Sequence, residues 1–156
     1  MIKFANDPLF MKFLLTLLLT SLLSAPLPWL SNIEQAKTEA SQSHKYIFLN
    51  FSGSDWCGPC IRMHKEIFDS EAFEKYAAQN LVLVNADFPR LKKNQLSKEQ
   101  IKQNEFLADQ YNAGGKFPFT VILDANGKVL KSWEGYPNVA PEKFIDDVNS
   151  VVHAVP

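Results

Sequence analysis

The feature that most constrains this chain is a pair of cysteines, Cys57 and Cys60, separated only by Gly58 and Pro59. The surrounding segment GSDWCGPC holds two glycines and a proline, which is typical of a loop, and a helical pattern follows it. The chain has no other cysteine, whereas a scaffold held by disulfides uses more cysteines at wider spacing. The pair is therefore predicted to carry chemistry at a junction between a loop and a helix.

A place at the start of a helix gives the two sulfurs different roles. The unpaired N–H groups and the dipole of a helix N-terminus favour an anion, so the pKa of a thiol there is lowered. We expect Cys57 to be the exposed cap residue and the nucleophile, with Cys60 shielded one turn into the helix. Cys57 would attack a substrate disulfide and Cys60 would resolve the mixed disulfide. Pro59 suits the first turn, where its missing N–H has no partner to lose.

Other uses of the pair are weighed against redox chemistry. A permanent structural disulfide gains little from closing so short a loop. Cys57, Cys60 and His64 could offer three ligands to a metal such as copper, but a closed zinc site usually needs four. Attachment of a c-type haem would need histidine directly after the second cysteine, where Ile61 stands. The sequence therefore predicts no cofactor and no metal site, and a metal carrier stays an alternative.

The beginning of the chain has the pattern of a targeting segment. Met11 and Lys12 precede an uncharged run at 13–25, FLLTLLLTSLLSA, which ends in small residues. A positive start, an apolar stretch too short to span a bilayer comfortably and a small-residue end are the layout of a secretory signal. We predict that residues 1–25 are a signal peptide or N-terminal membrane-targeting segment and that residues 26–156 form one domain.

Such a signal would place the domain in the periplasm or another extracytoplasmic space. If the signal is not cleaved, the apolar run can be extended through Trp29 and Leu30 and would act as a membrane anchor.

Length and composition indicate an ordinary globular domain. The chain has 156 residues, of which 46% are hydrophobic and 21% charged, so it can build a core and is not expected to be disordered. The formal net charge is -1, and binding to phosphate backbones needs a basic surface. Nucleic acid is therefore not expected as a partner.

Hydrophobic patterning predicts alternating helices and strands. The expected strands are 45–51, 81–88, 119–124 and 128–135, and the expected helices are 31–41, 61–68, a short one from Ser70, 101–111 and one from Pro141.

Local signals add detail to this order. Ser31 with Glu34 is a capping-box pattern that opens the first helix, and Asn126-Gly127 indicates a hairpin between the last two strands. The apolar run at 81–88 is expected to be a strand buried on both faces. The polar, lysine-rich stretch 89–100 is predicted to be a surface insertion.

With these elements in place, the sequence resembles the thioredoxin family. The segment WCGPC at 56–60 matches the active-site motif of that family, and strand 45–51 and KFPFTVILDANGKVL at 116–130 extend the similarity over roughly residues 31–152. The resemblance implies an α/β, thioredoxin-like fold with a central mixed β-sheet flanked by helices.

The resemblance also implies roles for individual residues. Pro118 falls where the family has a cis-proline facing the disulfide, and Phe117 would lend its backbone to a substrate peptide by strand-like pairing. Trp56 would form an apolar rim beside Cys57, and Gly58 and Pro59 complete the active-site loop. Core packing for Trp56, and a turn at the start of a strand for Pro118, are the alternatives.

The sequence departs from the family pattern at the proton relay. The family commonly buries an acid on the strand before the motif, where it can accept the proton of the second cysteine, and this strand carries Asn50 instead. The lysine that often accompanies that acid has no match at 81–88. The stretch 89–104 also exceeds a minimal family member and could shape a surface for partners.

These features together predict a thiol–disulfide oxidoreductase that reduces or exchanges disulfides in exported proteins. The active pair are the only cysteines, so electrons must come from outside, and a membrane-bound thiol donor is the expected partner. A copper-carrying chaperone and a non-catalytic thioredoxin-like binding module are the alternatives.

Overall fold

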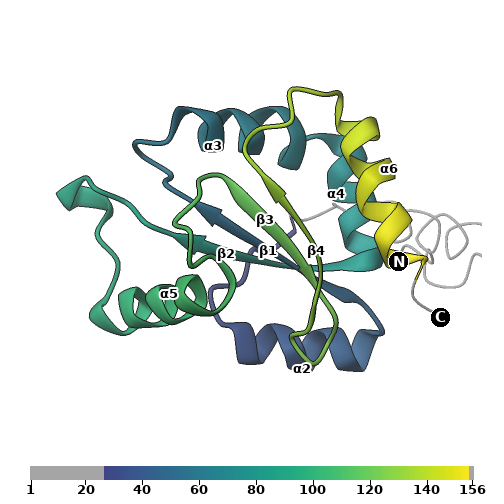
Figure 1. Ribbon diagram of the computed structural model, residues 1–156, viewed down its shortest axis with the longest axis horizontal. Helices are drawn as coiled ribbons and strands as arrows, with labels where there is room; N and C mark the ends of the chain where they lie inside the picture. The colour runs from purple at the N-terminus through teal and green to yellow at the C-terminus, as the bar shows by residue number, and fades with distance from the viewer. Residues whose placement is uncertain (1–26, 155–156) are drawn as a thin grey trace, which may run out of the picture.

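The computed structural model describes residues 27–154, so the predicted signal at 1–25 lies outside the described residues. A four-stranded sheet in the order β2-β1-β3-β4 forms the centre of the domain (Figure 1). The elements in chain order are α2 (Ile33–Ser43), β1 (Tyr46–Ser52), α3 (Gly58–Met63), the π-helical turn η1 (His64–Phe68), α4 (Glu71–Asn80), β2 (Leu81–Asp87), the 3-10 turn η2 (Lys92–Asn94), α5 (Lys98–Tyr111), β3 (Phe119–Leu123), β4 (Val129–Glu134) and α6 (Pro141–Val152).

The sheet is mixed, as predicted. Strand β1 pairs in parallel with β2 and antiparallel with β3, and β3 pairs antiparallel with β4. The Asn126-Gly127 hairpin is confirmed: Gly127 has φ 84, and the Asp124 carboxylate accepts hydrogen bonds from the backbone N–H groups of Asn126 and Lys128 at 2.9 Å each.

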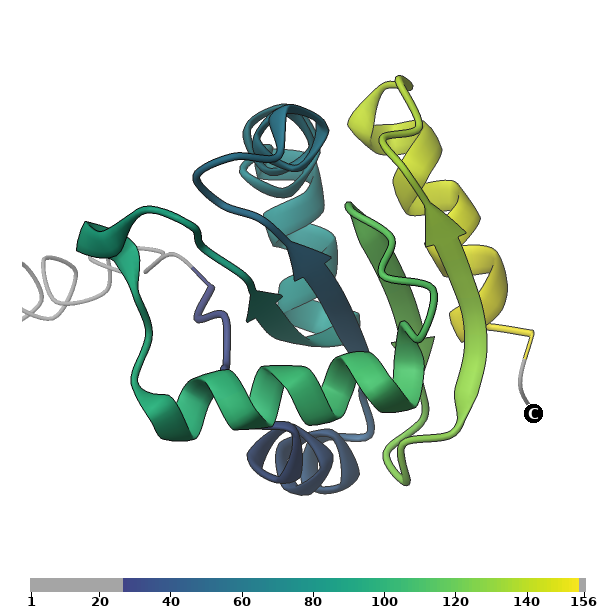
Figure 2. The same cartoon turned by 60° about the vertical axis from the view of Figure 1, so that its left-hand side comes forward.

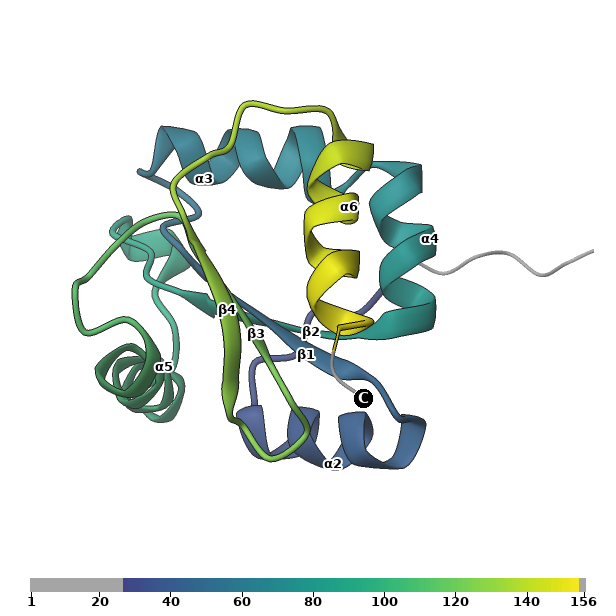
Figure 3. The ribbon, with the colours of Figure 1, turned by 45° about the vertical axis from the view of Figure 1, so that its right-hand side comes forward.

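Helices cover both faces of the sheet because side chains along β1 alternate between them. Ile47, Leu49 and Phe51 pack on one face with α2 and α5, and Phe48 packs on the other with α3, α4 and α6. Figure 2 shows α2 and α5 on their side of the sheet, and Figure 3 shows α3, α4 and α6 on the opposite side. The predicted order of helices and strands is therefore confirmed, and the domain is a three-layer α/β structure.

The segment just before α2 belongs to this fold. The Leu30 N–H donates to the backbone oxygen of Leu83 at 2.8 Å, and the Asn85 N–H donates to that of Leu30 at 3.0 Å, so Leu30 lines the outer edge of β2. The Trp29 ring packs against Phe48 and Phe68, with ring centroids 6.1 and 5.3 Å apart. In this structure both residues are part of the domain, which contradicts extending the apolar run through them. No helix within residues 27–154 has the length and apolar character needed to cross a membrane.

Three helix starts differ from the predicted ranges. Helix α3 starts at Gly58 rather than at 61, directly after its cap Cys57. The other two starts differ because of the side chain that caps each helix. Asn32, not Ser31, caps α2: its side-chain oxygen accepts the N–H groups of Glu34 and Gln35 at 2.9 and 3.0 Å. Helix α5 starts at Lys98 rather than at 101, because the Ser97 hydroxyl accepts the N–H of Gln100 at 3.1 Å. Asparagine and serine are both strong N-caps, and pattern alone does not choose between neighbours.

Candidate active site

The disulfide lies where β1 passes into α3, at the carboxyl end of the central strand. The backbone oxygen of Gly53 accepts the N–H of Cys57 at 2.9 Å, which folds the loop back on itself. Cys57 is the N-cap of α3, and its sulfur accepts the N–H of Cys60 at 3.3 Å. The two cysteines form a disulfide with their Cα atoms 5.2 Å apart, with Gly58 and Pro59 in the first turn between them.

The exposure of Cys57 is lower than predicted. Cys57 is 6% exposed and Cys60 is 3% exposed, so both cysteines are buried in this disulfide form. The physical reason is that each sulfur covers the other and the loop from Gly53 closes over the cap. The cap position of Cys57, rather than its exposure, is what distinguishes the two sulfurs in the structure.

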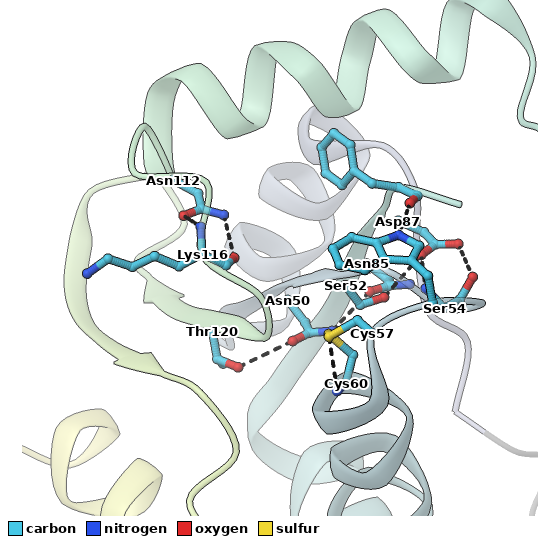
Figure 4. Close-up of a disulfide and its surroundings, with 12 residues drawn as sticks. Asn50, Ser52, Ser54, Cys57, Cys60, Asn85, Asp87, Asn112, Lys116 and Thr120 are labelled. Atoms are coloured by element: carbon cyan, nitrogen blue, oxygen red, sulfur yellow. Dashed lines mark hydrogen bonds between the residues drawn. A yellow bond between two sulfur atoms is a disulfide. The ribbon is translucent and has the colours of Figure 1, made fainter. Parts of the chain in front are cut away.

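A chain of neutral polar side chains runs through the sheet next to the site (Figure 4). Asn50 is 1% exposed, its side-chain nitrogen donates to the Asn85 side-chain oxygen at 3.1 Å, and its oxygen accepts the Thr120 hydroxyl at 3.3 Å. Asn50 and Asn85 are direct partners in the parallel register of β1 and β2. An amide pair therefore occupies the place where the resemblance would put a carboxylate.

A cavity lies between this amide pair and Cys60, because Asn85 and Cys60 both line it. The cavity has a volume of about 250 Å³, and its lining includes Cys60, Asn85, Ser52 and His64. This space is large enough to admit water, and the Ser52, Asn85 and His64 side chains offer polar partners for it. Cys60 therefore faces a cavity through which water can carry its proton without a buried carboxylate.

Trp56 is fixed beside the disulfide by three contacts. Its indole N–H donates to the backbone oxygen of Phe88 at 2.7 Å, its ring meets the Phe117 ring edge-on at 5.5 Å, and the Arg90 guanidinium lies over it at 3.7 Å. A Cβ on Gly53 would come within 2.3 Å of the indole, so the loop needs glycine at that position for the ring to pack.

Asp55 is a residue whose role the sequence did not reveal. Its carboxylate accepts the backbone N–H groups of Arg90 and Leu91 and the side-chain N–H of Asn94, each at 2.9 Å. These donors, with the Arg90 N–H the strongest cause, hold the pKa of Asp55 below its ordinary value. Asp55 thus ties the insertion after β2 to the active-site loop rather than serving as a plain solvated turn residue.

We predict that Asp55→Ala loosens this insertion while the domain stays folded. The amide hydrogens of Arg90 and Leu91 lose their acceptor and should exchange with solvent about tenfold faster or more. Because the folded pKa of Asp55 is depressed, wild type should show the same loosening only as pH falls through that pKa. Hydrogen exchange by NMR measures both effects, and Asp109→Ala, on the exposed side of α5, is the matched control. Unchanged exchange at Arg90 and Leu91 would show that the three hydrogen bonds do not hold the insertion.

The loop with Phe117 and Pro118 contacts Trp56 through the Phe117 ring. The Phe117–Pro118 peptide bond is cis, as the resemblance implied. Asn112 braces this loop: it accepts the Lys116 N–H at 3.0 Å and donates to the Lys116 backbone oxygen at 2.9 Å. The backbone oxygen of Pro118 accepts the Gly135 N–H at 2.9 Å, and the role of Phe117 in binding substrate stays a prediction.

His64 lines the same cavity as Cys60. Its ring packs against Trp29 and Phe68 with centroids 5.1 and 5.3 Å apart, and its Nδ1 is 3.5 Å from an Asp69 oxygen. Within residues 27–154, no three His, Cys, Asp or Glu side chains are grouped closely enough to hold a metal ion.

Comparison with known proteins now decides the family. A model described as a thioredoxin-like domain matches residues 33–149. The chain belongs to the thioredoxin-like family. The match begins at the first residue of α2 and ends within α6, so it covers the sheet, both helical layers and the disulfide.

Two curated relatives of this thioredoxin-like chain come from Chlamydia pneumoniae. It is 43% identical over 107 residues to the disulfide bond reductase DsbH, a match that covers 69% of this chain and 62% of DsbH. It is 26% identical over 126 residues to the thioredoxin-related protein DsbJ, covering 81% of this chain and 35% of DsbJ. The chain therefore spans less than two thirds of the length of either relative.

Solved structures agree with the thioredoxin-like fold. A structure of DsbH oxidoreductase has 37% identity and a TM-score of 0.74, with 83% of this chain and 86% of that one covered. A thioredoxin from Thermus thermophilus has 15% identity and a TM-score of 0.61 over 81% of this chain and 88% of that one, which supports the fold alone.

Proposed function

We propose that this protein is a disulfide bond reductase that acts on exported proteins through Cys57 and Cys60. The observation that carries the proposal is a Cys57–Cys60 disulfide at the N-terminus of α3, in a chain 43% identical to a disulfide bond reductase. A dithiol in this setting exchanges readily, because the helix N-terminus stabilises the thiolate of Cys57.

The proposed reaction has two balanced steps. The Cys57 thiolate attacks one sulfur of a substrate disulfide, the substrate S–S bond breaks, and one substrate thiolate leaves and takes up a proton. Cys60 then loses its proton and attacks the Cys57 sulfur, which releases the second substrate thiol and leaves the enzyme disulfide. The substrate gains two electrons and two protons, so an external thiol donor must reduce the enzyme again.

The proposal also covers the location of the protein and the source of its electrons. The leader pattern at 1–25 supports an extracytoplasmic, periplasmic location, and a membrane-bound thiol protein would be the electron donor there.

A turbidity assay tests the reductase activity. With dithiothreitol as reductant, the purified protein should speed the precipitation of insulin chains well above the rate with dithiothreitol alone, and the Cys57→Ser variant should not. A wild-type rate equal to the background would contradict the proposal and favour a non-catalytic binding module.

A further inference from the structure

A second cavity, of about 470 Å³, has Trp56, the residue before Cys57, in its lining and is separate from the one next to Cys60. Its lining includes Trp56, Phe88, Phe117, Arg90, Leu96 and Ile101. Its volume falls within the range of sites that bind small molecules or large side chains, roughly 300–1,000 Å³. One wall comes from the active-site loop and the other from the connection between β2 and α5, which projects from the domain in Figure 1.

Ring contacts and hydrogen bonds hold the cavity in shape. The rings of Trp56 and Phe88 both meet the Phe117 ring edge-on at 5.5 Å, and the indole N–H donates to the Phe88 backbone oxygen. Asn104, 2% exposed, donates to the Asp87 backbone oxygen at 2.7 Å and ties α5 to the end of β2. The Asp55 carboxylate holds the adjoining backbone at Arg90 and Leu91, so the cavity is a pre-formed site rather than a gap between loops.

The segment that forms one wall of the cavity is basic, and the charged side chains in the lining itself are Arg90 and Asp87. Residues 89–98 carry four basic side chains and no acidic one, in a chain whose net charge is only -1. Arg90 lies flat on Trp56, and among residues 27–154 no carboxylate forms an ion pair with it. The Asp87 carboxylate, which also lines the cavity, accepts hydrogen bonds from the hydroxyls of Ser52 and Ser54 (Figure 4), and it forms no ion pair with Arg90 in the described part of the chain. A guanidinium stacked in this way presents N–H donors that suit a carboxylate.

We propose that this cavity is a substrate subsite that takes a large apolar side chain near the substrate cysteine, with Arg90 pairing to a carboxylate next to that side chain. The preferred substrates are then disulfide-bonded proteins with an apolar residue and an acidic residue beside the reacting cysteine. This inference rests on the proposed reductase function, because it assigns selectivity to the same disulfide. The connection between β2 and α5 supplies Phe88, Arg90 and Leu96 to the cavity, and these side chains would contact the apolar and the acidic residue of the substrate.

Short peptides test the subsite directly. Each peptide has one cysteine in a mixed disulfide with thionitrobenzoate, followed by Phe-Glu, Phe-Gln or Ser-Glu. Attack of the reduced enzyme on the peptide sulfur releases coloured thionitrobenzoate, and the second-order rate constant is measured in a single turnover. Wild type should prefer Phe-Glu to Phe-Gln about threefold at low salt, with less preference at high salt. Phe-Glu should exceed Ser-Glu about tenfold.

Variants assign the preference to Arg90. The Glu-to-Gln ratio should fall below one in Arg90→Glu, and because it is a ratio within one variant, a general change in dithiol reactivity cancels. Lys143→Glu makes the same charge change on α6, where Lys143 pairs only with Asp147, and should keep the wild-type ratio. Equal ratios in wild type and Arg90→Glu, or equal rates for Phe-Glu and Ser-Glu, would overturn the subsite while leaving the reductase function intact. Thionitrobenzoate release no faster than with Cys57→Ser would overturn both.

Discussion

Serine in place of Cys60 should turn this protein from a catalyst into a covalent trap. Cys57 can still attack a substrate disulfide, but the mixed disulfide has no neighbouring thiol to resolve it, so the adduct accumulates. Insulin reduction should fall to the background rate of dithiothreitol. Non-reducing gels of acid-quenched cells should show adducts that collapse to the free protein when a reductant is added.

The captured proteins also test where the enzyme works. Under the proposed function, mass spectrometry should identify adducts with proteins that carry export signals, together with the membrane-bound donor. The Cys57→Ser variant is the matched control and should form few adducts, because Cys60 lies one turn into α3 and lacks the cap position that stabilises a thiolate. Adducts only with proteins that lack export signals would contradict the exported location, and more adducts with Cys57→Ser than with Cys60→Ser would reverse the roles of the two sulfurs.

The sequence was most informative where one residue type has few structural uses. Asn126-Gly127 predicted the β3–β4 hairpin, because φ of 84 at Gly127 suits glycine. The apolar run at 81–88 predicted a buried strand, and β2 occupies Leu81–Asp87 beside β1. The motif at 56–60 predicted the pair that forms the disulfide.

The sequence was less informative where the outcome depends on contacts between distant segments. Asp55 binds N–H groups more than thirty residues away, and nothing local distinguishes it from a solvated loop acid. Trp29 looked like a continuation of the apolar leader, and only packing against Phe48 and Phe68 places it in the domain. The burial of Cys57 depends on how its loop folds back to Gly53, which no spacing rule predicts.

Introducing an acid at Asn50 should accelerate the second chemical step. Cys60 must lose its proton while buried, and burial raises the pKa of a thiol. The amides of Asn50 and Asn85 have no useful basicity. We therefore infer that the proton leaves through water in the cavity that Cys60 shares with the ionisable side chains of His64 and Asp69, or is taken by the departing substrate thiolate. Resolution is then the slow step of the reaction.

The Asn50→Asp variant places a base in this network. One carboxylate oxygen can keep the hydrogen bond from Thr120, and the Asn85 amide can rotate to donate to the other. Burial should raise the pKa of the new carboxyl, which brings it closer to working pH as a proton acceptor. Stopped-flow decay of an enzyme–peptide mixed disulfide should be about tenfold to a hundredfold faster than in wild type near pH 7. The gain should shrink as pH rises toward about 9, because hydroxide then competes with the new carboxylate for the Cys60 proton.

The same substitution should lower stability in a pH-dependent way. A carboxyl whose folded pKa is raised above its unfolded value destabilises the fold progressively as pH rises from the unfolded pKa to the folded one. The loss should therefore be about 1–3 kcal/mol near pH 7 and should nearly vanish near pH 4, as measured by urea unfolding. Asn80→Asp adds the same charge at the last residue of α4, just before β2. It tests whether the change in net charge alone alters the rate of resolution. Identical decay rates in wild type and Asn50→Asp across the whole pH range would show that proton removal from Cys60 does not limit the reaction.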